Sequence, residues 1–218
     1  MWGIVWCATV WASDVTDLLA DAGWEHFDTV SAGEAGLLVI DVKRLETPCL
    51  RVAARVDLPA EVLMDVVTDV PAAPQITRET LIASEVLRHS GDQMDYYQHL
   101  DVPGWTLAAD RFWVLRGENI QRPEGPMFQW HRFEWSTDYP ELAARLAAEH
   151  PSAIEPEVNW GAWTFEETDG TTHARYHLCS DAGGRLPRWV RKLAATRTIP
   201  ATVEDVVRAA RRRLRLRP

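Results

Sequence analysis

The chain has 218 residues, of which 46% are hydrophobic and 25% are charged, which is enough to bury the core of one domain and excludes a disordered chain. Its net charge of −9 is unevenly spread: residues 1–184 contain 30 acids and 12 bases, and residues 185–218 contain 11 bases and 2 acids. No apolar run approaches the length of a membrane-spanning helix. An acidic chain without a recognised reader motif is not expected to bind nucleic acid.

The N-terminal segment, residues 1–23, has two interpretations. Its first twelve residues are apolar and end in the letters VWA, the pattern of a signal-peptidase site, although the run is short and no base precedes it. The other interpretation is a packed helix, because Trp2, Trp6 and Val10 share one helix face. The first implies a periplasmic or secreted protein and the second a cytoplasmic one, and the sequence leaves both open.

Apolar periodicity and turn residues predict helices and strands in mixed order after this segment. Helices are expected at Val15–Ala22, before Gly23, and at Ala60–Val67, after Pro59. Strands are expected at Gly36–Leu45, Cys49–Leu58, Thr80–His89, Gln93–Val102, Arg111–Gln121 and Met127–Thr137.

The remaining elements complete one α+β domain. A helix at Tyr139–His150 precedes a hairpin of two strands, Trp160–Glu167 and Thr172–Asp181, around an Asp-Gly turn. Two helical pieces follow, Leu186–Thr196 and Ala201–Arg215, and the second has apolar residues on one side and arginines on the other. This order predicts an antiparallel sheet covered by a long C-terminal helix.

Four groups of short motifs occur in the order and spacing of a known family. They are Ala22–Glu25 with Gly36–Val39, Val56–Val62 with Val66–Val70, Pro103–Trp105 with Asp110–Arg116, and Gly161–Phe165 with Ala174–Leu178 and Asp181–Val190. From about Trp24 to its end, the chain resembles the START (steroidogenic acute regulatory-related lipid-transfer) domain in its small bacterial single-domain form.

The resemblance implies a helix-grip fold: a curved antiparallel sheet wrapped around the C-terminal helix, with an internal apolar cavity. Residues 24–218 would form the lipid-binding domain, with a helical insertion near residues 139–150. It implies that the protein binds and transfers a lipid or sterol, catalyses nothing and needs no cofactor. One alternative is an enzyme like the polyketide cyclases and aromatases, which act on an acyl chain in the same cavity. Another is a module that presents a ligand or helix to a protein partner.

Arg116 is the polar residue of most interest, because some START domains keep a buried arginine at this place to meet the polar end of the lipid. Phe112 and Val114 share its strand face, and Tyr97 and His99 lie on one face of the preceding strand. A surface arginine or a structural ion pair is the other interpretation of Arg116. The candidate ligand-binding residues are Arg116, Phe112, Val114, Tyr97, His99, Trp105, His131, Trp163 and Trp189; for the enzyme alternative, Tyr97, His99, Arg116 and His131 are the acid–base candidates.

No motif marks catalytic or metal chemistry. The three cysteines, Cys7, Cys49 and Cys179, are far apart and predict neither a disulfide framework nor a zinc site. His177 and Cys179 share a strand face, but a closed zinc site needs four ligands. Nucleophile-elbow, metalloprotease, dinucleotide and phosphate-loop motifs are absent from the sequence. The basic C-terminal helix is either a contact for an anionic membrane or a solvated face.

Overall fold

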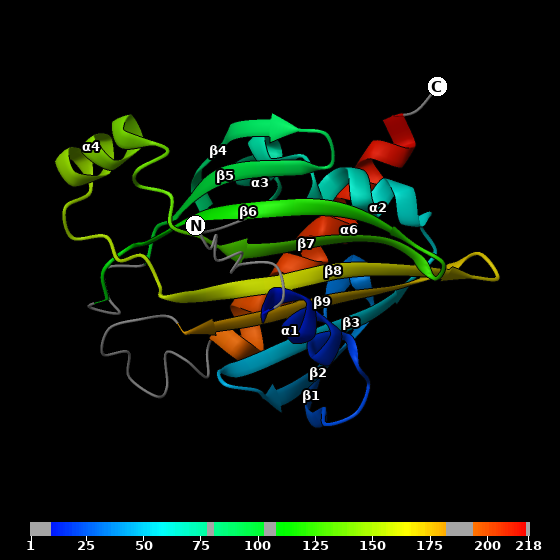
Figure 1. Ribbon diagram of the computed structural model, residues 1–218. Helices are drawn as coiled ribbons and strands as arrows, with labels where there is room; N and C mark the ends of the chain where they lie inside the picture. Colours follow the sequence, from blue (N-terminus) through cyan, green and yellow to red (C-terminus); the bar gives the residue numbers. More distant parts are fainter. Residues whose placement is uncertain (1–9, 78–80, 103–107, 182–193, 217–218) are drawn as a thin grey trace, which may run out of the picture.

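The computed structural model describes residues 10–77, 81–102, 108–181 and 194–216, and its main feature is a curved nine-stranded antiparallel sheet (Figure 1). Along the sheet the strands run in the order β1-β2-β3-β9-β8-β7-β6-β5-β4, so that β3 pairs with the last strand. The strands are β1 (Glu25–Ser31), β2 (Leu37–Arg44), β3 (Pro48–Val56), β4 (Leu81–Ser90), β5 (Gln93–Leu100), β6 (Arg111–Arg122), β7 (Gly125–Arg132), β8 (Val158–Thr168) and β9 (Thr171–Asp181).

Helices cover both faces of this sheet. The long helix α6 and the shorter α2 lie on one face, here named the inner face, while α1 lies on the opposite, outer face (Figure 1). The apolar side of α4 also packs on the outer face, against β5 and β6. The helices are α1 (Val10–Leu19), α2 (Ala60–Val67), α3 (Ala73–Ile76), α4 (Pro140–Glu149) and α6 (Ile199–Leu216), with short turns at Gly33–Ala35, Val70–Ala72 and Ala194–Thr198.

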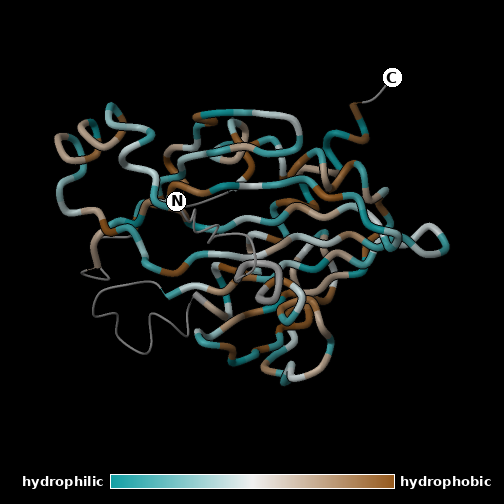
Figure 2. Tube along the Cα trace, in the orientation of Figure 1, coloured by the Kyte–Doolittle hydropathy of each residue, from teal (hydrophilic) through white to brown (hydrophobic). Residues whose placement is uncertain are grey.

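The main core lies between the inner face and α6. Hydrophobic and hydrophilic residues alternate along the strands (Figure 2), because successive side chains point to opposite faces. Val203 and Val207 of α6 are fully buried in the same cluster as Ile40 of β2 and Val52 of β3. The apolar period of the C-terminal segment therefore predicted the helix face that packs on the sheet.

Most expected elements agree with the structure to within a few residues. α2 agrees at both ends, and the Asp-Gly hairpin is present, with Asp169 and Gly170 both at positive φ as a type I′ turn requires. The strand β1 was not expected, because its sequence is polar and its residues are mostly exposed. The strand expected up to Thr137 ends at Arg132. The helix expected at 186–196 lies mostly outside the described residues.

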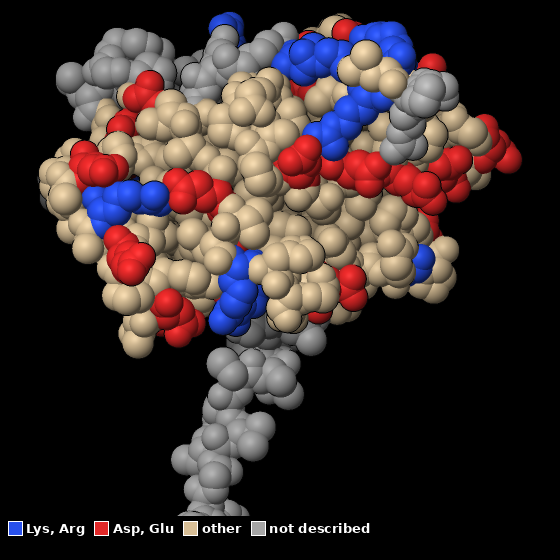
Figure 3. Space-filling model, turned by 90° about the horizontal axis from the view of Figure 1, so that it is seen from above, with Lys and Arg blue, Asp and Glu red and all other residues tan. Residues whose placement is uncertain are grey.

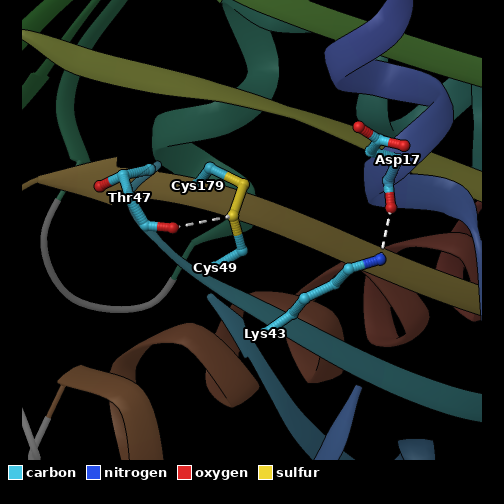
Figure 4. Close-up of a disulfide and its surroundings, with 5 residues drawn as sticks. All are labelled: Asp17, Lys43, Thr47, Cys49 and Cys179. Atoms are coloured by element: carbon cyan, nitrogen blue, oxygen red, sulfur yellow. Dashed lines mark hydrogen bonds between the residues drawn. A yellow bond between two sulfur atoms is a disulfide. The ribbon is translucent and has the colours of Figure 1, made fainter. Parts of the chain in front are cut away.

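The cysteine spacing predicted no disulfide framework, but one pair of cysteines is bonded. Cys49 of β3 and Cys179 of β9 are joined by a disulfide that closes 130 residues of chain (Figure 4). Both cysteines are buried on the outer face, where Leu18 of α1 and Trp160 belong to the same cluster. Beside it, Lys43 donates to the backbone carbonyl of Asp17, which holds α1 against β2. The bond links strands that are neighbours in the sheet and distant in sequence.

Candidate functional site

The inner face carries a continuous aromatic surface along its middle strands. The ring of Tyr176 on β9 stacks on Trp163 of β8, with centroids 4.5 Å apart, and on Trp130 of β7 at 5.7 Å. Phe128 continues the surface at 6.2 Å from Trp130, and Tyr96 lies 6.3 Å beyond it. Cross-strand pairing of Trp163 with both Phe128 and Tyr176 sets this arrangement, since paired residues point to the same side.

Some side chains of this face are not completely buried. Trp113, Tyr176 and Leu178 belong to the inner cluster but remain partly exposed, and so do Leu50 and Ile199. Core side chains are usually packed on all sides, so these keep area that another molecule could contact. The described part of the inner face can therefore contact an apolar molecule through flat rings.

Few polar atoms interrupt this surface. Trp130 Nε1 donates to Asn159 Oδ1 at 3.0 Å, and Trp113 Nε1 is buried without a partner among the described residues. Burial raises the pKa of the Tyr176 phenol, and burial together with Tyr176 raises that of Tyr96, so both stay neutral. An apolar wall with a few neutral hydrogen-bonding groups suits a hydrophobic ligand with a small polar end.

The sequence-predicted ligand residues do not all meet at this surface. Trp163 lies on the inner face, whereas Trp105 and Trp189 lie outside the described residues. The other six lie on the outer face, away from this aromatic surface: Phe112, Val114, Arg116, Tyr97, His99 and His131. Alternation explains the difference, because their strand neighbours Trp113, Leu115 and Tyr96 are the inward residues.

Arg116 belongs to an ion-pair cluster on the outer face. Its Nε and Nη2 donate to the two carboxylate oxygens of Asp95 at 2.7 and 3.0 Å, and Asp95 is only 3% exposed. Arg88 and the hydroxyl of Tyr139 also donate to Asp95, at 2.6 and 2.7 Å. Burial alone would raise the pKa of Asp95, but the hydrogen bonds from Arg116 and Tyr139 and the nearby positive charges lower it. The cluster is satisfied internally, as a structural ion pair is.

His99 belongs to a second outer-face group. The Tyr97 hydroxyl lies 2.8 Å from its Nδ1, Asp110 lies 3.5 Å from its Nε2, and the His150 ring is centred 4.2 Å away. Burial and the His150 charge lower the pKa of His99, and burial raises that of Tyr97 to about 12. No histidine in the described part of the chain is buried on the inner face, so the acid–base candidates are not placed there.

Three of the five arginines of α6 are paired with acids within the fold. Arg208, Arg211 and Arg213 of α6 pair with Asp205, Asp57 and Asp69. On the face shown in Figure 3, basic side chains lie beside acidic ones. No helix within the described ranges has the length and apolar character needed to cross a membrane. The same ranges contain no group of three or more metal-ligating side chains.

Comparisons with known proteins agree with this architecture. Structures that match include the STAR-related lipid transfer protein of Xanthomonas axonopodis (TM-score 0.69, 18% identity, 87% of this chain and 99% of that one). Human StAR-related lipid transfer protein 5 matches with a TM-score of 0.75 and 14% identity over 93% of both chains. The Zhui aromatase/cyclase of a Streptomyces species matches at 0.56 and 18% identity, over 77% of this chain and 96% of that one. No curated protein matches by sequence.

The structural matches are below 25% identity, so they show the fold, which is the helix-grip fold of START domains. A family model provides the sequence evidence, and it matches residues 56–207, more than half of the chain, from the end of β3 into α6. The chain therefore belongs to the family described as polyketide cyclase / dehydrase and lipid transport.

Proposed function

We propose that the protein binds a lipid or sterol between the inner face and α6 and transfers it without catalysis. The observation that carries this proposal is the aromatic surface formed by Trp130, Trp163 and Tyr176, with core rings that keep accessible area. Affinity would come from apolar burial, at about 25 cal/mol per Å² removed from water. Flat indole and phenol rings suit a fused-ring or acyl ligand.

The cyclase or aromatase alternative has less support from the residues. Such an enzyme needs an acid or base beside the bound chain, with a pKa near the working pH. The titratable inner-face groups described above are Tyr96 and Tyr176, whose raised pKa values make them poor bases. The Streptomyces aromatase/cyclase shares the fold, which by itself assigns no reaction.

Transfer requires a membrane contact, and the end of α6 is the place we propose for it. Leu216 is 82% exposed there and Leu214 is 40% exposed, next to the exposed Arg212 and Arg215. Exposed leucines can enter the headgroup region while arginines attract anionic lipids. Leu216→Ser should reduce binding to vesicles that contain phosphatidylserine. Ile82→Ser, at an exposed site on β4, should leave that binding unchanged; an equal loss in both variants would contradict this contact.

The test of ligand binding is native mass spectrometry of the purified protein, followed by organic extraction and lipid identification. Leu178→Trp would fill space beside Tyr176, whereas Leu37→Trp makes the same change at a residue that is 67% exposed. We expect a stoichiometric lipid adduct in the wild type and in Leu37→Trp, and loss of the adduct in Leu178→Trp. An adduct that survives in Leu178→Trp, or a wild type that binds no lipid of a broad panel, would overturn the proposal.

A further inference from the structure

A small polar pocket lies on the outer face, away from the aromatic surface. It has a volume of about 100 Å³ and lies between the C-terminal end of α1 and strands β6, β8 and β9. Its polar lining includes Thr164 and His177, which are 1% and 2% exposed, and the guanidinium of Arg122. Arg175 and Glu166 also line it.

Unpartnered polar atoms gather in this pocket. The described residues contain ten buried side-chain nitrogen or oxygen atoms without a hydrogen-bond partner, and four of them are here. They are Nε and Nη2 of Arg122, the hydroxyl of Thr164 and Nδ1 of His177. An unpaired buried polar group is costly, and native proteins pair most of them with protein atoms or ordered molecules. Their concentration in one cavity indicates that a polar ligand supplies their missing hydrogen bonds.

The unpartnered atoms of the pocket favour an anion as this ligand. Nε and Nη2 form one edge of the Arg122 guanidinium, and this edge fits two oxygens of a carboxylate or phosphate. Glu166 does not occupy that edge, because its Oε1 lies 3.9 Å from Arg122 Nη2 and 2.6 Å from Arg175 Nη1. The Thr164 hydroxyl adds a third donor from the floor of the pocket.

His177 adds a neutral partner in positive surroundings. Burial, together with the charges of Arg51, Arg175 and Arg122, lowers its pKa to about 3, although the hydrogen bond with the Ala162 backbone raises it. The imidazole therefore stays neutral at ordinary pH, and in the tautomer that carries its proton on Nδ1 it donates one hydrogen bond into the pocket. Acids are also close, but they have basic partners: Glu166 pairs with Arg175, and Asp21 pairs with Arg51.

We infer that this pocket binds a small free oxoanion of the phosphate or carboxylate type, held by Arg122 and Thr164 with His177 as a neutral donor. About 100 Å³ is several times the space that one water requires, and less than the roughly 300 Å³ of pockets for drug-sized ligands. The sheet separates the pocket from the proposed lipid-binding surface, so a variant can lose anion binding and keep lipid binding, or the reverse.

The test is an NMR titration of the full chain with inorganic phosphate and with acetate, each against chloride at equal ionic strength and pH. Saturable shifts of the Thr164 and His177 amides with phosphate or acetate support the proposal, and the stronger binder of the two identifies the anion type. We expect Arg122→Gln to weaken binding at least about tenfold, the effect of losing one charged hydrogen bond. Arg55→Gln removes the same charge from an exposed site on β3 and should leave the affinity nearly unchanged.

A second variant covers the case in which Arg122→Gln folds poorly. Thr164→Val removes a hydroxyl that has no partner, so without the anion it should melt at the wild-type temperature or above. Its affinity for the anion should still fall. Shifts that match those of chloride, or equal affinities in the wild type and both pocket variants, would show that the pocket holds only water and overturn the inference. Arg122→Gln should retain the lipid adduct, which distinguishes this test from that of lipid binding.

Discussion

Arg116→Leu is the substitution that best separates a ligand contact from a structural ion pair. It removes two charge-assisted hydrogen bonds, at 2.7 and 3.0 Å, from a carboxylate that is only 3% exposed. Removing one partner of a buried pair typically costs 3–5 kcal/mol. Arg88 and Tyr139 still donate to Asp95, so we expect about 2–3 kcal/mol. For a chain of this length, that lowers the melting temperature by about 5–10 °C.

The assay combines calorimetry or urea denaturation with the lipid-adduct measurement. Because Arg116 lies on the outer face, the variant should be less stable but keep its lipid. Adding Asp95→Asn should recover part of the loss, because it removes the uncompensated carboxylate. A variant of wild-type stability that loses its lipid would refute this reasoning and make Arg116 a ligand contact.

The pH dependence gives an independent check on the same pair. Hydrogen bonds and nearby charges lower the pKa of Asp95 below its ordinary value of 3.8 in spite of burial. A carboxyl with a lowered pKa stabilises the fold above its unfolded pKa, and this stabilisation is lost as the pH falls through the folded value. The difference in stability between wild type and Arg116→Leu should therefore be constant near neutral pH and shrink below about pH 4.

Three further predictions concern the outer face and the turns. Reduction of the Cys49–Cys179 bond reopens a loop of 130 residues and should cost about 5 kcal/mol by chain entropy; equal urea midpoints with and without reductant would contradict it. Gly125→Ala should cost at least about 2 kcal/mol in calorimetry, because the glycine has φ of 133° and an added Cβ would lie 2.1 Å from the Phe165 carbonyl oxygen. His177 has a pKa lowered from 6.5 to about 3, so stability should fall as the pH drops from 6.5, by at most about 1.4 kcal/mol per pH unit. His177→Gln should weaken this dependence in urea midpoints.

The grouping of residues on strand faces was predictable from the sequence, but the identity of the face was not. Phe112, Val114 and Arg116 do share one face, as alternation predicted. Alternation does not tell which face the C-terminal helix covers. Near β6 the outer face packs against α4 and the inner face belongs to the main core, so Trp113 and Leu115 are as apolar as their neighbours. When both faces of a strand are apolar, the hydrophobic pattern of its sequence does not show which face points inward.

The Asp-Gly turn contained a signal that would have resolved part of this ambiguity. Its register pairs Thr168 with Thr171, and counting back along both strands places Trp163 opposite Tyr176. Tyr176 could therefore have been added to the ligand residues as soon as Trp163 was proposed. Trp130 could not, because its place beside them depends on how β7 pairs with β8 on either side of helix α4.

The disulfide was beyond sequence reasoning for a related reason. Cys49 and Cys179 become neighbours only because the first three strands join the sheet at β9, the last strand in the chain. Pairing of cysteines requires their Cα atoms to lie within about 7 Å, and 130 intervening residues give no local indication of that distance. The bond joins β3 and β9, the neighbouring strands that lie farthest apart in sequence, where the entropy cost of closing the loop is largest. Because such bonds persist in oxidising compartments, the protein should hold its full stability if exported and lose about 5 kcal/mol of it in a reducing cytosol.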